Sequence, residues 1–136
     1  MAKIKNQTGA IVASKALDDE LETCMENLFN NDFPLLPDDY IKFLKMADGF
    51  LWNGMEIFGT ANINAEEYTA PNIVSANQNY DEKYPKLIGK LVVGKMDNDL
   101  FAYDYTTRKY QVIDTVDCEA LQDFASIEEL VLSIMK

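Results

Sequence analysis

The segment from Leu36 to Gly59 constrains the fold of this 136-residue chain more than any other. Pro37 suits the first position of a helix because its φ is already helical, and the two acidic residues after it are favoured by the helix dipole. Apolar side chains then recur at i, i+3, i+4 and i+7, which indicates a helix with one buried face. These side chains are Tyr40, Phe43, Leu44 and Ala47.

A strand is expected to follow this helix directly. Gly49 lies where a left-handed residue would end the helix. Residues 51–58 are rich in apolar and aromatic side chains, which predicts one largely buried strand, with Gly54 at a bulge or a close approach and Gly59 at a turn. A helix that leads into a buried strand is typical of a domain in which helices pack on a sheet.

Capping residues and apolar spacing predict three further helices. One begins at Ser14 and carries a strongly acidic outer face, and a second begins at Pro71. The third follows Ser126, which forms a capping box with the acidic residue three positions later. Residues 60–71 are interpreted as a loop, in which residues 66–68 favour one turn of helix.

The remaining strands follow from alternation and turn residues. Residues 90–93 predict a central strand, and residues 100–105 and 110–115 predict an antiparallel hairpin. Residues 1–13 form a weak lead-in, either strand-like or frayed. We therefore expect one α+β domain over residues 1–136, with helices packed on a twisted, mostly antiparallel sheet.

The net charge of the chain limits the classes of partner that it can bind. It has 23 acidic and 12 basic residues, for a net charge of −11. Phosphate binding depends on Lys and Arg, so we expect neither nucleic acid nor an anionic membrane surface as a partner. A basic protein would instead be steered towards this surface. No apolar stretch approaches the roughly 18 residues of a membrane helix. With no signal peptide expected, the predicted location is the cytoplasm.

The residue types give little support to catalysis. The chain has no histidine, which removes the usual neutral-pH base and the commonest metal ligand. Asp97-Asn98-Asp99 begins like a calcium loop, but Phe101 and Ala102 occupy positions that need an oxygen ligand and a glycine. Cys24 and Cys118 lack the spacing of a metal site or a disulfide framework. We therefore predict a protein that is not an enzyme and binds no cofactor or metal.

The order of these segments resembles the SUKH superfamily, which includes yeast Smi/Knr-type regulators of cell-wall synthesis and many bacterial immunity proteins. The similarity covers most of the chain beyond about residue 14, although Asp48-Gly49 replaces the Asn-Gly that is commoner in the family. The matching residues are Leu36-Pro37, Tyr40, Phe43-Leu44, Gly49, Ile57-Phe58-Gly59, Leu91-Val92-Val93-Gly94, the segment Asp97 to Asp104, Val112 and the run Phe124 to Leu130.

The resemblance implies a non-catalytic protein-binding module. In bacteria, such a protein would be an immunity protein that neutralises a polymorphic toxin, often a nuclease, by docking its acidic surface on the basic toxin domain. The alternative is an intracellular scaffold or regulatory module that binds a non-toxin protein. Four residues on or beside the matched strands are the predicted partner contacts, and the alternative for each is ordinary surface or core. They are Glu56, Asp97, Asp99 and Tyr105.

Overall fold

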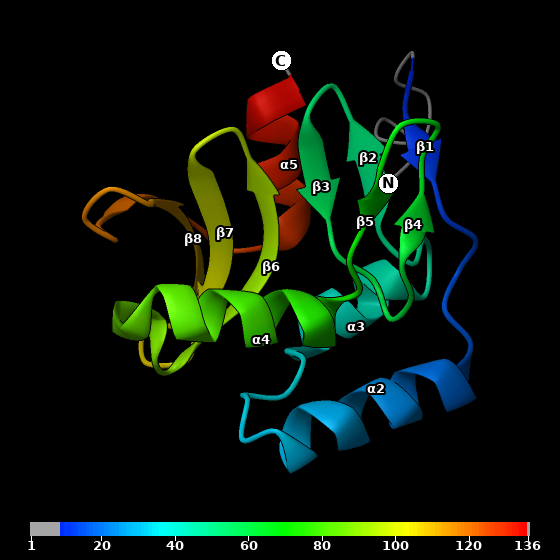
Figure 1. The fold of residues 1–136 in the computed structure, drawn as a ribbon, viewed down its shortest axis with the longest axis horizontal. Helices are drawn as coiled ribbons and strands as arrows, with labels where there is room; N and C mark the ends of the chain where they lie inside the picture. The colour runs from blue at the N-terminus through cyan, green and yellow to red at the C-terminus, as the bar shows by residue number, and fades with distance from the viewer. Residues whose placement is uncertain (1–8, 136) are drawn as a thin grey trace.

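The computed structural model describes residues 9–135 and is built around one antiparallel sheet of seven strands in the order β1-β2-β3-β6-β7-β8-β9 (Figure 1). A small two-stranded sheet, β4-β5, lies in front of the first strands. The strands are β1 (Ile11–Val12), β2 (Phe50–Trp52), β3 (Met55–Ile57), β4 (Ile63–Asn64), β5 (Thr69–Ala70), β6 (Lys90–Met96), β7 (Asp99–Asp104), β8 (Lys109–Asp114) and β9 (Ala120–Phe124).

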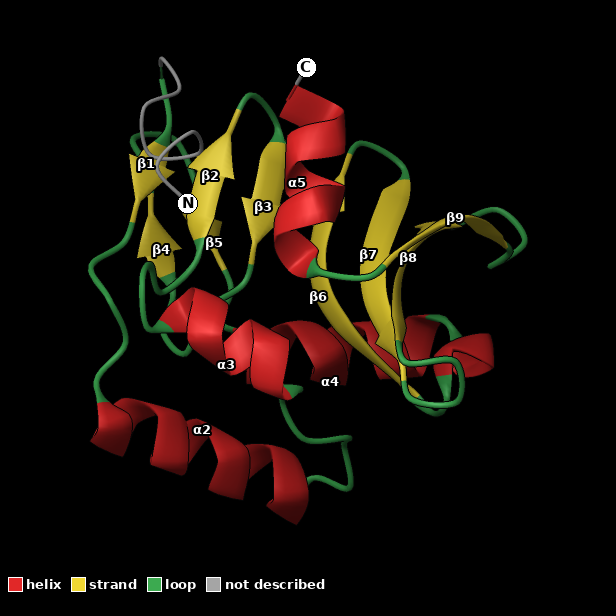
Figure 2. Ribbon diagram, turned by 180° about the vertical axis from the view of Figure 1, so that it is seen from behind, coloured by secondary structure: helices red, strands yellow, loops and turns green. Residues whose placement is uncertain are grey.

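Helices cover both faces of the large sheet. Helix α5 runs along one face, with α3 at its lower end, and α4 lies on the opposite side (Figures 1 and 2). The outermost helix, α2, packs on the lower side of α3 and α4. This arrangement confirms the predicted α+β class with a sheet and packed helices. The helices are α2 (Asp18–Asn30), α3 (Asp38–Leu44), α4 (Ile73–Lys83), the 3₁₀ turn η1 (Pro85–Leu87) and α5 (Ile127–Met135).

The predicted apolar stripe of α3 is confirmed, but its ends differ from the prediction. All four stripe residues are buried. Pro37 precedes the first helical residue, with an extended ψ of 153°, and is therefore the N-cap residue. The helix ends at Leu44, so Gly49, with φ +89°, leads into β2 instead of terminating α3.

The single strand predicted over residues 51–58 is wrong. The chain reverses at Asn53-Gly54, where both residues have positive φ (46° and 86°), and β2 and β3 form a hairpin. Asn-Gly is the most favourable sequence for such a two-residue turn, so a local signal was available. Because of the reversal, Leu51 packs in a small cluster with Ile63, whereas Met55 joins the main core.

Other boundaries also changed. Helix α2 begins at Asp18 and not at Ser14. Helix α4 begins after its N-cap Asn72, and not at Pro71, and continues to Lys83. Residues 60–71 contain β4 and β5 instead of a turn of helix.

Near the two ends of the chain, some predicted elements are present and one strand was not predicted. Strand β9 was not predicted, because its residues alternate poorly and are mostly exposed. At the predicted cap of α5, the Glu129 N–H donates to Ser126 Oγ (3.1 Å), while the Glu129 carboxylate accepts from the N–H of Ala125. Of the lead-in over residues 1–13, residues 11–12 form β1 at the sheet edge, and residues 1–8 lie outside the described part.

Two buried side chains complete the sheet where β3 stops short of β6. The Tyr40 hydroxyl donates to the backbone carbonyls of Phe58 and Val93 (3.1 Å for the latter). Beyond that point, the Asn77 side chain takes the place of a missing strand. Its Oδ1 accepts from the N–H of Val92 (2.9 Å), and its Nδ2 donates to the carbonyl of the same residue (2.8 Å). Buried backbone groups are thereby satisfied without a neighbouring strand.

We predict that Asn77→Leu lowers the free energy of unfolding by about 2–4 kcal/mol, since each buried polar group left unpaired costs roughly 1–3 kcal/mol. The backbone N–H and C=O of Val92 would both lose their partner. Urea denaturation followed by circular dichroism would measure the change. The matched control is Asn79→Ala on the exposed side of the same helix, expected to lie within about 0.5 kcal/mol of wild type. Equal stabilities of the two variants would contradict this role of Asn77.

Candidate functional site

Glu56, the first of the four predicted contact residues, lies in the middle of β3 on the face that α4 covers. Its carboxylate is 3.7 Å from the Lys95 amine on the neighbouring strand. Burial, and after it the nearby Glu56 carboxylate, raises the pKa of Tyr80 in α4. Glu56 therefore forms a half-buried ion pair with Lys95 that joins β3 to β6, on the side of the sheet where α4 lies.

Asp97 and Asp99 lie together at the tight turn between β6 and β7. Asp97 is exposed with φ +53°, and Asp99 begins β7 directly opposite Asp114 of β8. Burial, and then the carboxylates of Asp114 and Asp97, raise the pKa of Asp99. Like charges placed opposite each other on neighbouring strands destabilise a sheet. This end of the sheet is thus strongly acidic and electrostatically strained.

Tyr105 follows the other end of β7. Six residue steps of extended chain separate it from Asp99, a distance of roughly 20 Å. The structure therefore brings Asp97 and Asp99 together, places Tyr105 at the opposite end, and puts Glu56 on the α4 face. The four residues form no continuous surface.

Around Tyr105, however, the fold assembles an aromatic cluster. The rings of Tyr103 and Tyr105 meet edge to face at 4.8 Å, and those of Tyr103 and Tyr110 at 4.9 Å. Tyr103 and Tyr110 are register partners on β7 and β8, so both rings lie on the same face of the sheet. Tyr105 is 36% exposed, Tyr103 is half-buried and Tyr110 is fully buried, so the cluster grades from surface to core.

These tyrosines line an open hollow of about 370 Å³ that we call the tyrosine pocket. Its other walls come from the turn after β7 and from two segments far away in sequence, the start of α3 and the residue after β9. The lining residues are Leu36, Pro37, Asp38, Asp39, Tyr103, Tyr105, Arg108, Tyr110 and Ala125.

Carboxylates dominate the polar wall of the tyrosine pocket. Asp38 is exposed, and Asp39 Oδ2 accepts from the N–H of Ile127 at the start of α5 (3.0 Å). Burial, and then the neighbouring Asp39, raises the pKa of Tyr110. The Tyr110 hydroxyl is buried and completes no hydrogen bond of normal geometry within the described residues. Unpaired buried hydroxyls are uncommon in native proteins.

The edge strand β9 lies next to the tyrosine pocket. Phe124 of β9 pairs with Tyr110, and Ala125 lines the pocket. No helix covers the outer part of β9 in either ribbon view (Figures 1 and 2). Leu121 is 57% exposed, and Val116 in the preceding loop is 87% exposed. An uncovered edge strand with apolar side chains is a place where another chain can pair.

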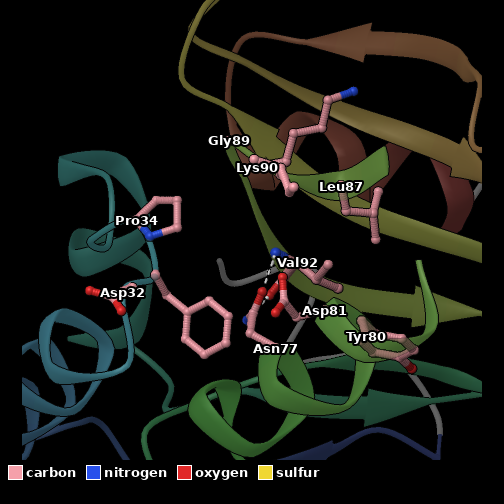
Figure 3. Close-up of a pocket in the computed structure, with 11 residues that line it drawn as sticks. Asp32, Pro34, Asn77, Tyr80, Asp81, Leu87, Gly89, Lys90 and Val92 are labelled. Atoms are coloured by element: carbon pink, nitrogen blue, oxygen red, sulfur yellow. Dashed lines mark hydrogen bonds between the residues drawn. The ribbon is translucent and has the colours of Figure 1, made fainter. Parts of the chain in front are cut away.

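The cavity in Figure 3 is a weaker candidate. It holds about 120 Å³ between α4, η1, β6 and the segment around Phe33. Two of its polar side chains already have partners inside the protein: Asn77 bonds the backbone of Val92, and the Lys90 amine donates to Gln111 (2.9 Å). It therefore serves packing more than binding.

A larger groove of about 420 Å³ runs between α2 and the start of α4 and contains Cys24. Burial, and after it the Asp48 carboxylate, raises the pKa of this thiol to about 11. Cys24 is therefore protonated at neutral pH and a poor nucleophile, since the thiolate is the reactive form. Within residues 9–135, no three His, Cys, Asp or Glu side chains gather as a metal site would require. In the same part of the chain, no helix is long and apolar enough to cross a membrane.

Comparison with known proteins finds a relative of this chain. Over 87 residues the chain is 32% identical to the putative uncharacterized protein YrhA of Escherichia coli (strain K12), covering 60% of this chain and 61% of that protein. The chain thus spans less than two thirds of this relative, whose name states no activity. No protein-family model matches the chain, and the resemblance to the SUKH superfamily stays a prediction.

Asp99→Asn should stabilise the protein at neutral pH by roughly 0.2–1 kcal/mol, the usual range for a cross-strand pair. The folded state raises the pKa of Asp99, so ionisation of this group opposes folding. The gain should therefore be present above the folded-state pKa and disappear as the pH falls through it. Urea denaturation of wild type and variant across this pH range would measure the difference.

The control for this experiment is Glu22→Gln on the exposed side of α2, which removes the same charge far from the β6–β7 turn. If Glu22→Gln stabilised the protein as much as Asp99→Asn, the effect would come from net charge and not from the Asp99–Asp114 contact.

Proposed function

We propose that this protein is a non-catalytic module that binds a basic protein domain through the tyrosine pocket and the adjacent edge strand β9. The observation that carries the proposal is the grouping of three tyrosines and two carboxylates around an open pocket beside an uncovered strand. Tyrosine is enriched among the residues that dominate binding energy at interfaces. An exposed strand edge adds main-chain hydrogen bonds to a partner's extended segment.

The acidic composition suits a basic partner. A net charge of −11 attracts a positively charged domain over a distance and speeds encounter, an effect that weakens as salt rises. Charge does little to slow release, so tight binding needs buried anchors. Nanomolar affinity corresponds to about −12 kcal/mol. It is usually reached over roughly 800 Å² per partner, an area larger than the pocket alone and consistent with use of β9.

The resemblance to the SUKH superfamily leads us to propose that the partner is a polymorphic toxin and that this chain is its immunity protein. An acidic module seated over the active site of a nuclease would compete with the anionic substrate. Such a role needs no catalytic group in the immunity protein itself. A scaffold or regulatory module that binds a non-toxin protein would use the same surface without inhibiting anything.

The test is co-expression with the basic domain encoded beside this gene in the source organism. We expect the domain alone to arrest growth, co-expression to restore it, and the two proteins to co-purify at high salt. Rescue without a purified complex would contradict direct neutralisation. A stable complex with a non-toxic regulatory protein would support the scaffold alternative. Absence of both would contradict the proposal.

We predict that Tyr105→Ala weakens the complex about 30-fold or more, as expected when an interface anchor worth about 2 kcal/mol is lost. Leu121→Asp, which places a charge on the exposed side of β9, should also weaken it. Calorimetric titration would measure both affinities. Asn79→Ala on α4, remote from the pocket and β9, should bind like wild type, and equal affinities for all three variants would place the interface elsewhere.

A further inference from the structure

We infer that the tyrosine pocket is a receptor for one arginine side chain of the partner. This inference rests on the proposed function, because it assigns the occupant of the same site. The structural basis is the combination of aromatic faces, carboxylates and a small open volume on one wall of the fold.

The size of the pocket fits a single side chain. Its volume of about 370 Å³ lies at the low end of the range of roughly 300–1,000 Å³ for small-molecule pockets. It opens to solvent between the start of α3 and the end of β7, where Tyr105 is 36% exposed. A flexible side chain could enter from a partner lying over β9.

The aromatic wall favours a cation. The edge-to-face contact between Tyr103 and Tyr105 turns their rings nearly perpendicular, with an interplanar angle of 83°. The edge of one ring therefore covers one face of the other, and only the remaining ring faces can receive a ligand. A guanidinium placed over a tyrosine face gains a cation–π interaction of roughly 0.5–1 kcal/mol at an exposed site.

The polar wall favours arginine over lysine. The carboxylates of Asp38 and Asp39 and the hydroxyls of three tyrosines can all accept hydrogen bonds. Arginine carries five donors in a planar fork and stacks on aromatic rings, whereas lysine offers a compact charge with three donors. Among the described residues, the Tyr110 hydroxyl at the buried end of the pocket makes no hydrogen bond of normal geometry, although Asp39 lies close enough to raise its pKa.

The protein's own Arg108 does not neutralise the site. It lies in the turn after β7 and lines the pocket, but among the described residues no ion pair joins it to Asp38 or Asp39. Two carboxylates against one guanidinium leave a net negative charge in the pocket. Arg108 should therefore weaken the binding of an incoming arginine, because the two positive charges repel each other and compete for the same carboxylates.

The experiment uses the full chain and a probe that carries one guanidinium, N-acetyl-arginine-N-methylamide, at 150 mM salt. The uncharged citrulline analogue is the matched control ligand. We expect NMR titration to show saturable shifts at the rings of Tyr103 and Tyr105 with the arginine probe only. Shifts spread over all acidic surfaces, equal shifts with citrulline, or none would overturn the inference.

Variants test the assigned charges. Asp38→Asn should lower the affinity for the arginine probe about threefold, and Arg108→Gln should raise it about threefold. Changes of this size are typical of exposed charge pairs. Glu67→Gln in the β4–β5 turn, beside the opposite edge of the sheet, removes an equal charge and should leave probe affinity unchanged. If it weakened the probe as much as Asp38→Asn, general attraction would explain the binding and the pocket would not.

Different outcomes would contradict the proposed function and the arginine pocket. Probe binding without any basic protein partner would contradict the proposed function and leave the pocket assignment standing. A tight complex whose affinity does not change with Asp38→Asn or Arg108→Gln would support the function and overturn the arginine pocket.

Discussion

The hydrogen bonds that Tyr40 and Asn77 make to the interior of the sheet are the constraint on which the rest of the structure depends. Strand β3 ends at Ile57, while β6 continues beyond it: the Val93 carbonyl still accepts from the Phe58 N–H, but the N–H and C=O of Val92 face α4 instead of a strand. A hydroxyl from α3 and an amide from α4 fill that gap. Each helix is thereby fixed to the sheet by a hydrogen bond as well as by apolar packing. Because the hydrogen bond is directional, it sets the position of the helix.

The same contact positions the candidate site. Tyr40 is buried in the core and holds α3 against the sheet, so the preceding residue, Asp39, is carried to the side of Tyr110. Asp39 then accepts a hydrogen bond from the first residue of α5, which closes the wall of the tyrosine pocket behind β8. A binding surface supported by core contacts in this way would be rigid before a partner arrives, and preorganisation of that kind strengthens binding.

Negative charge is distributed unequally over the two ends of β7. At one end Asp99 faces Asp114 and Asp97, and Asp114 also accepts a hydrogen bond from the N–H of Val116 in the following turn. At the other end, carboxylates meet aromatic rings and one arginine around an open hollow. The first arrangement attracts cations over a distance, whereas the second can also hold one in place. We therefore assign long-range steering to the whole acidic surface and anchoring to the tyrosine pocket.

Local patterns in the sequence determined the α+β class, the buried stripe of α3, the β7–β8 hairpin and the absence of any histidine chemistry, because periodicity and residue type act over a few neighbours. The Asn53-Gly54 turn was equally local, yet the aromatic run around it favoured one strand. The tertiary structure alone decided which side chains share a surface. It set Glu56 on the α4 face apart from the other predicted contacts, paired the exposed β9 with β8, and brought Asp39 to Tyr110 across 71 positions of the chain. Such contacts depend on how elements pack, and spacing along the sequence carries no record of them.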